Sequence, residues 1–236
     1  MTQKEEIRNW YNTFSANQKI TGVNLRHYTI VNKLLSLGLK SNSKVLEIGC
    51  GIGTLTGLLS NKVKKGKLVA TDISDESIRI AGQRLNNPKH VELFVTDMAD
   101  FSVDEKFDFV VLPDVMEHIP VEQHADLFMT IRKHLHQDSI VFIHIPHPKA
   151  IEYVRENDPD KLQVIDQALS ANRLISDAYK HNFLLMEYKA YKLFSNSFDY
   201  VFITFGIDKP LEHIKPIRQN SIILNKLIER MKYYLS

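Results

Sequence analysis

One glycine-rich turn constrains the fold more than any other part of the sequence. The apolar run 44–48 leads directly into the turn 49–53, which reads Gly-Cys-Gly-Ile-Gly, and residues 54–61 then have the composition of an opening helix. A strand, a glycine turn and a helix in this order form the first unit of a Rossmann-like sheet. Glycines let backbone N–H groups approach a ligand closely where a Cβ would clash. The sequence therefore predicts an α/β fold with a ligand site at this turn.

The spacing of the glycines bears on the class of ligand. A dinucleotide site of the G-x-G-x-x-G type would need glycine at position 54, where this chain has Thr54. The third glycine comes one residue earlier, and an acid, Glu47, lies two residues before the first. This spacing disfavours an NAD-dependent enzyme.

The segment 47–53, E-I-G-C-G-I-G, resembles motif I of the class I S-adenosylmethionine-dependent methyltransferases. The resemblance extends over roughly residues 40–206. It implies a Rossmann-like, seven-stranded, mostly parallel sheet with an antiparallel end strand, helices on both faces and an N-terminal helical cap. It also implies S-adenosyl-L-methionine as the cofactor.

Two further acids follow predicted strands. Asp72 ends the run 67–72, where a Rossmann arrangement has its ribose-binding carboxylate, and the alternative is that Asp72 caps the next helix. Asp97 and Met98 follow the alternating run 90–96; the resemblance implies contacts with adenine, and a helix N-cap is the alternative. The predicted cofactor-binding residues are Glu47, Gly49, Gly51, Gly53, Asp72, Ile73, Asp97, Met98 and Pro113.

The segment 113–120, P-D-V-M-E-H-I-P, follows the apolar run 107–112 and resembles the fourth motif of the small-molecule branch, which includes ubiquinone-type O-methyltransferases. A hydroxyl or a protonated amine must lose a proton when it is methylated, and histidine suits that task near neutral pH. His118 and His147 are the first candidates, and His144, within a predicted buried strand, is the third, with a hydrogen-bonded core histidine as the alternative. A carboxylate acceptor would need no base. Magnesium held by Glu117 and His118 is a weaker alternative, so no metal site is predicted.

The flanking segments are expected to complete the site. Helices are predicted over 3–14 and 24–37, and the resemblance implies that they form a cap (1–40), with Tyr11 and His27 as substrate contacts. The alternative for Tyr11 is that it packs these helices onto the sheet. Arg26 could meet the methionine carboxylate of the cofactor or lie on a solvated face. Within the core (41–207), the resemblance implies a lid over 149–182, with Gln163 and Asp166 facing the substrate.

Length and composition predict a single domain over residues 1–236. A net charge of +2 gives no reason to expect a nucleic-acid partner, and the single cysteine, Cys50, fits a reducing, cytoplasmic location. No apolar run approaches the roughly 20 residues of a membrane helix. The extension 208–236 ends in a basic amphipathic helix, expected to dock on its own domain or to join a homodimer, with a membrane surface as the alternative.

The sequence thus predicts a methyltransferase that acts on a small molecule, at oxygen (a hydroxyl or a carboxylate) rather than nitrogen. An N-methyltransferase of a small amine or amino acid is the first alternative. A non-catalytic cofactor-binding subunit and an RNA methyltransferase are further alternatives.

Overall fold

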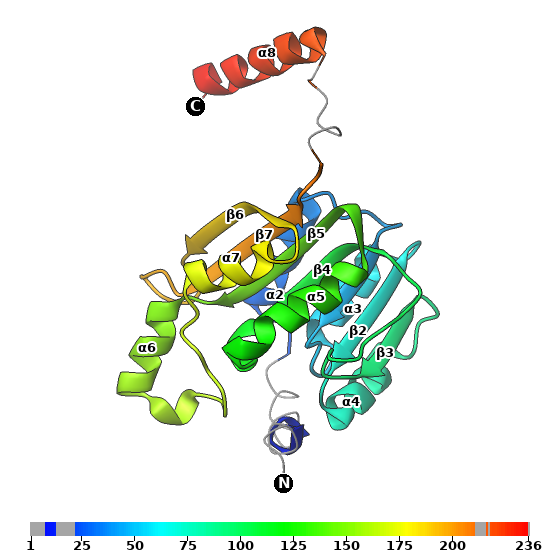
Figure 1. Ribbon diagram of the computed structural model, residues 1–236, viewed down its shortest axis with the longest axis vertical. Helices are drawn as coiled ribbons and strands as arrows, with labels where there is room; N and C mark the ends of the chain where they lie inside the picture. Colours follow the sequence, from blue (N-terminus) through cyan, green and yellow to red (C-terminus); the bar gives the residue numbers. More distant parts are fainter. Residues whose placement is uncertain (1–7, 13–21, 211–215, 217, 236) are drawn as a thin grey trace.

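The computed structural model describes residues 8–12, 22–210, 216 and 218–235. Its centre is one seven-stranded sheet in the order β3-β2-β1-β4-β5-β7-β6 (Figure 1). β7 runs antiparallel to both of its neighbours, and the remaining pairs are parallel, so the predicted sheet type is confirmed. The strands are β1 (Lys44–Ile48), β2 (Lys67–Asp72), β3 (Val91–Val95), β4 (Phe107–Pro113), β5 (Leu135–Pro146), β6 (Phe183–Tyr191) and β7 (Tyr200–Ile207).

The central strands are buried on both faces, as parallel strands between helices should be. In β4, Phe109 and Val111 belong to the apolar cluster under α2 and α3, whereas Val110 and Leu112 belong to the cluster under α5 and α7. Helices therefore cover both faces, as predicted. The helices that pack around the sheet are α2 (Leu25–Ser36), α3 (Thr54–Lys62), α4 (Asp75–Leu85), α5 (His124–Lys133) and α7 (Ala171–Tyr179).

The segment 149–182, predicted as a lid, divides into two parts. Its first part contains α6 (Pro148–Asn157), the short helix η3 (Pro159–Lys161) and residues 162–170, which have no regular structure. Its last part is α7, whose Leu174 and Ala178 are fully buried in the core. Only residues before α7 are therefore available to cover the site, because α7 serves as a sheet-covering helix.

The two ends of the chain differ in their packing. Residues 8–12 are helical and lie against the start of α4, where Arg8 and Asn12 both contact Asp75. The rest of the predicted helix 3–14 lies outside the described residues. α8 (Gln219–Leu235) stands apart from the sheet (Figure 1), and its residues 219–232 are exposed, so the expected docking on its own domain is not found. No described helix has the length and apolarity needed to cross a membrane.

Candidate active site

A cavity of about 780 Å³ lies where four parallel strands end. Residues at the carboxyl ends of β1, β2, β3 and β4 line it, which is where open α/β sheets bind ligands. All the predicted cofactor residues except Gly53 line this cavity. These are Glu47, Gly49, Gly51, Asp72, Ile73, Asp97, Met98 and Pro113.

The glycine turn needs its glycines for two different reasons. Gly49 has a φ of 76°, and a Cβ there would lie 2.3 Å from Cγ2 of Val115, so it lets the loops after β1 and β4 meet. Gly53 has a φ of 77° at the N-terminus of α3, where a Cβ would lie 3.0 Å from that of Ala81 on α4. Gly53 therefore serves helix packing and lies outside the cavity lining.

Asp72 joins the glycine turn to the next loop. Its Oδ2 accepts from the backbone N–H of Gly51 at 2.8 Å, and its Oδ1 accepts from that of Ser74 at 2.9 Å. Burial raises the pKa of Asp72, while these hydrogen bonds act against that rise. The N-cap of α4 is Ser74, whose hydroxyl accepts from the backbone of Ser77, so Asp72 is not that cap. Asp72 is thus a carboxylate held at the cavity wall by the backbone.

Glu47 is a fully buried acid in the same wall. Neither of its carboxylate oxygens has a hydrogen-bond partner within 3.5 Å among the described residues. Burial raises the pKa of Glu47 to about 8, and the hydroxyl of Thr56 is the neighbouring group that acts to lower it. A buried carboxylate without donors is costly, so this position favours a ligand that brings N–H groups. The amino group of S-adenosyl-L-methionine is such a donor, and the residues present therefore fit that cofactor.

Asp97 and Met98 lie on the loop after β3. The side chain of Asp97 accepts from the backbone N–H of Ala99 at 3.1 Å, and Met98 is buried with a left-handed φ of 70°. The Sδ of Met98 lies 3.6 Å from Oγ1 of Thr71 on β2. The loop therefore offers the cavity an acid beside an apolar side chain.

The three candidate histidines have different surroundings. His118 lines the cavity. His144 is almost fully buried in β5; its Nδ1 lies 2.9 Å from Asp114 and its Nε2 lies 2.6 Å from the hydroxyl of Tyr191. Burial is the main reason that the pKa of His144 falls to about 3. His147 caps α6 by accepting from the backbone of Lys149 and does not line the cavity.

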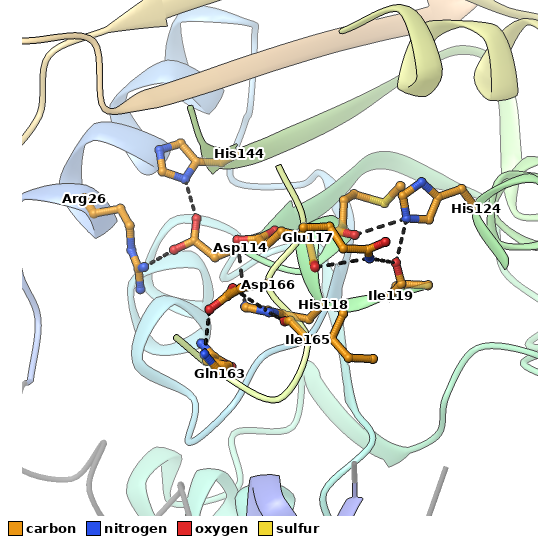
Figure 2. A network of polar contacts seen from close by, with 12 residues as sticks. Arg26, Asp114, Glu117, His118, Ile119, His124, His144, Gln163, Ile165 and Asp166 are labelled. Carbon is orange, nitrogen blue, oxygen red and sulfur yellow. Dashed lines mark hydrogen bonds and ion pairs between the residues drawn. The ribbon is translucent and has the colours of Figure 1, made fainter. Parts of the chain in front are cut away.

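His118 is held on one side of its ring. Its Nδ1 lies 2.6 Å from the carbonyl oxygen of Ile165 and 3.2 Å from Oδ1 of Asp166 (Figure 2). Its Nε2 lies 3.8 Å from Oε1 of Glu117. Burial lowers the pKa of His118, but Glu117, Asp166 and the Ile165 carbonyl outweigh burial and raise it overall. His118 is thus a more basic histidine than usual.

The remaining predicted contacts separate into cavity and supporting residues. Tyr11, His27 and Gln163 line the cavity, whereas Asp166 lies behind His118. The ring of Tyr11 is 6.2 Å from that of His118, and burial raises the pKa of Tyr11. His27 completes the N-cap of α2 by accepting from the backbone of Asn24, and burial lowers its pKa to about 4.

Sequence reasoning missed the role of Asp114. Its side chain lines the cavity and pairs with both Arg26 and His144 (Figure 2). The position of Asp114 directly after a buried strand could have indicated this role, because the carboxyl ends of the strands form the ligand-binding edge of the sheet. Arg26 is therefore paired with a protein carboxylate rather than lying on a solvated face. In the described part of the chain, no group of three metal-ligating side chains could hold a metal ion.

Comparison with known proteins matches residues 45–138 to a family model described as a methyltransferase domain. Nodulation protein S of Rhizobium tropici is 33% identical over 86 residues, 36% of this chain and 35% of that protein. Malonyl-[acyl-carrier protein] O-methyltransferase of Priestia megaterium is 30% identical over 84 residues, 36% of this chain and 30% of that protein. The chain thus spans about a third of the length of these curated relatives.

Solved structures share the fold over most of the chain. The N-methyltransferase NodS from Bradyrhizobium japonicum, in complex with S-adenosyl-L-homocysteine, has a TM-score of 0.62 at 22% identity, covering 78% of this chain and 86% of that one. The magnesium protoporphyrin IX methyltransferase from Synechocystis, also with S-adenosyl-L-homocysteine bound, has a TM-score of 0.68 at 17% identity, covering 88% and 100%. Arg26, His144, Gln163 and Asp166 lie outside the segment that the family model matches.

Proposed function

We propose that this chain, whose residues 45–138 match a methyltransferase-domain family, is a class I S-adenosylmethionine-dependent methyltransferase that methylates an oxygen atom of a small-molecule acceptor. The observation that carries this proposal is His118, a cavity-lining histidine with one ring nitrogen held by Ile165 and Asp166. A hydroxyl acceptor would lose its proton to this histidine, and a carboxylate acceptor would not need it.

Four cavity residues are assigned to the cofactor. When bound, S-adenosyl-L-methionine supplies a methyl group already activated on a sulfonium sulfur, so the protein mainly has to align the acceptor and exclude water. We assign Asp72 to the ribose hydroxyls, because a carboxylate accepts strongly from both. Asp97 is assigned to the adenine amino group, with Met98 against the ring. Glu47 is assigned to the amino group of the methionine moiety, because its oxygens lack donors among the described residues.

The hydrogen bonds of His118 fix which nitrogen acts. A carbonyl oxygen only accepts, so the Nδ1 facing the Ile165 oxygen must carry the ring proton. The neutral ring then has its lone pair on Nε2. We propose that Nε2 takes the proton of the acceptor hydroxyl as the new O–CH₃ bond forms.

One observation favours nitrogen as the alternative acceptor atom. Arg26 is the one lysine or arginine among the described residues that line the cavity, and it is paired with Asp114. An acid-rich wall suits a protonated amine, which would also need a base. The acids in the lining are Glu47, Asp72, Asp97, Asp114 and Asp126.

The test is transfer of labelled methyl from S-adenosyl-L-methionine to pools of phenols, aliphatic hydroxy compounds, carboxylic acids, amines and transfer RNA. We expect labelling of one hydroxyl or carboxylate compound. For a hydroxyl, His118→Asn should lower kcat by roughly 10²–10⁴-fold while S-adenosylhomocysteine affinity stays unchanged. Labelling of amines alone would replace oxygen by nitrogen, and RNA labelling that falls steeply with salt would revive the RNA alternative. Cofactor binding without any turnover would instead indicate a non-catalytic subunit.

We also propose a cytoplasmic location and a homodimer formed through α8. Its exposed apolar side chains give the dimer proposal its basis: Ile222, Ile223, Leu224, Leu227, Ile228 and Met231. Light scattering of the full chain should then report a dimer that Leu227→Lys dissociates. A monomer at every concentration would exclude the dimer, and cell fractionation tests the location.

A further inference from the structure

We propose that residues 163–167, here called the strap, orient the catalytic base through Gln167 and Asp166 while offering Gln163 to the acceptor. This inference rests on the proposed role of His118 as the base. It assigns a positioning role to Gln167, which faces residues 117–119 and not the cavity. It also replaces the predicted substrate contact of Asp166 by a contact with His118.

Gln167 anchors the strap to the short helix η1 (Met116–His118) and the residue after it. Its backbone N–H donates to the carbonyl of Glu117 at 3.0 Å. Its side-chain Nε2 donates to the carbonyls of Ile119 at 2.6 Å and of Glu117 at 3.3 Å. The strap has no regular secondary structure of its own, so these bonds fix its position against the loop that carries His118.

Asp166 is positioned by the strap so that it can face His118. Its Oδ2 accepts from the backbone N–H of Gln163 at 2.6 Å, which leaves Oδ1 directed at the imidazole (Figure 2). The carbonyl of Ile165 occupies the same ring nitrogen. Two consecutive strap residues therefore hold Nδ1 protonated and direct Nε2 away from the strap. A carboxylate on the far nitrogen also stabilises the imidazolium that forms when Nε2 takes a proton.

Gln163 is the strap residue that reaches the cavity. Its Oε1 is buried and has no hydrogen-bond partner among the described residues, while the residue itself lines the cavity. A buried amide oxygen in a ligand cavity favours a ligand donor at that place. The inferred acceptor class is therefore a small molecule with a hydrogen-bond donor, hydroxyl or amine, in addition to the group that is methylated.

Three titratable groups lie close enough to His118 to affect its pKa in any pH experiment on the strap. Glu117 on η1 lies 3.8 Å from Nε2, Asp166 on the strap faces Nδ1, and Tyr11 packs against the ring. Glu117 is fully buried, and apart from this ion pair neither of its carboxylate oxygens has a hydrogen-bond partner among the residues that the structure describes. Glu117 remains in every strap variant, so a change in His118 between variants reports the strap.

The direct test is an NMR titration of ring-labelled histidines, with the His118 signal assigned by its loss in His118→Gln. Asp166→Asn and Gln167→Ala should each lower the pKa of His118, by about one unit, because a stabilising partner of the imidazolium is lost or displaced. Gln83→Ala, at an exposed position on α4, is the matched control and should leave that pKa unchanged. Unchanged His118 titration in both strap variants, with S-adenosylhomocysteine affinity intact, would overturn the inference.

Kinetics with the identified acceptor then separate the two roles of the strap. Gln167→Ala should lower kcat at least tenfold with little change in KM, and should shift the acid limb of the pH–rate profile to lower pH. Gln163→Ala should raise the acceptor KM with an unshifted profile. The NMR titration requires no turnover. An absence of methyl transfer would therefore contradict the proposed function, whereas the titration would still test whether the strap orients His118. Equal kinetic effects of the two variants would contradict the division of roles.

Discussion

Asp114 Oδ1 lies 2.9 Å from Nδ1 of His144, and the backbone of Asp114 reaches this position in the left-handed region, with a φ of 54°. The second carboxylate oxygen pairs with Arg26 on α2, and the far nitrogen of His144 lies 2.6 Å from the hydroxyl of Tyr191 on β6. Residues from α2, β5 and β6 therefore converge on one acid at the cavity wall. This chain of contacts ties α2 to β6, the strand at one edge of the sheet.

Asp114→Asn tests the charge of this acid without changing its backbone demands, because asparagine tolerates a left-handed φ. Loss of the carboxylate leaves Arg26 without its ion-pair partner, and the Nε of Arg26 is already buried and unpartnered among the described residues. We expect a loss of about 1–3 kcal/mol in the free energy of unfolding, measured by urea denaturation. Asp126→Asn, which changes another cavity acid, should lower the free energy of unfolding by no more than about 0.5 kcal/mol. Equal losses would contradict a special role for Asp114.

His144 should make stability fall as the pH is lowered. Its pKa in the folded protein is about 3, chiefly because of burial and secondly because of Arg26, against about 6.5 in an unfolded chain. The unfolded state therefore binds more protons below pH 6.5, and stability decreases from there towards pH 3. The slope for one group is at most about 1.4 kcal/mol per pH unit, so its contribution between pH 6.5 and 5 is roughly 1–2 kcal/mol.

Urea unfolding of His144→Gln at pH 7.5 and pH 5 measures this term. The variant should be less stable at pH 7.5, because Asp114 and Tyr191 lose their partner. It should also lose less stability than the wild type on acidification. Gln137→Ala, at an exposed position on β5 that does not titrate, should keep the wild-type slope. A slope unaltered in His144→Gln would assign the acid sensitivity to the other buried histidines.

The parts of the site that could be predicted from the sequence are those formed by short, continuous sequence motifs. The turn 49–53, Asp72 at the end of β2 and Asp97 on the loop after β3 could be predicted from apolar runs and the residues that interrupt them, and all of these except Gly53 line the cavity. Gly53 was predicted on the same pattern, but the pattern does not distinguish a glycine that approaches a ligand from one that lets two helices pack.

The contacts that could not be predicted join distant segments. Arg26 and Asp114 are 88 residues apart, and His118 and the carbonyl of Ile165 are 47 apart, so no periodicity relates them. Sequence alone also ranked His118 and His147 equally, ahead of His144, whereas of these three only His118 lines the cavity. The amphipathic pattern of α8 predicted a helix, which is present, but a pattern of apolar residues does not specify what covers it.

Glu47→Gln should separate stability from cofactor binding. Burial raises the pKa of Glu47 from 4.5 to about 8, so the folded state favours the neutral acid, and stability is lost as the pH rises from about 4.5 to 8. Glutamine removes that loss, and we expect the unliganded variant to be about 1–3 kcal/mol more stable at pH 8. Thermal unfolding at pH 5 and pH 8 measures the difference. The exposed Glu122→Gln is the control.

The same variant should bind the cofactor less tightly. If Glu47 accepts from the amino group of the methionine moiety, its replacement by a neutral amide should weaken S-adenosylhomocysteine binding about tenfold or more, since a charge-assisted hydrogen bond is lost. A variant that is stabilised yet binds with wild-type affinity would remove Glu47 from the cofactor site. A variant that is destabilised at pH 8 would contradict the buried, unpartnered state of the acid.

Asp72 offers the sharpest test of the cofactor assignment. Calorimetric titration with S-adenosylhomocysteine should show binding to the wild type that weakens 10–100-fold in Asp72→Ala, about 1.4 kcal/mol per tenfold. NAD should bind neither protein, because position 54 lacks the glycine of a dinucleotide turn. Because Asp72 also accepts from Gly51 and Ser74, the alanine variant could loosen the turn itself.

Asp72→Asn separates these two effects, because asparagine retains an oxygen for one backbone donor and loses the charge. Its unfolding should lie closer to the wild type than that of Asp72→Ala, while its affinity should still fall about tenfold, since one amide oxygen cannot serve both ribose hydroxyls as a carboxylate does. Asp100→Ala, on an exposed loop, should bind as the wild type does. Wild-type affinity in both Asp72 variants would exclude the ribose contact. Absence of S-adenosylhomocysteine binding to the wild type would leave the glycine turn in need of another ligand.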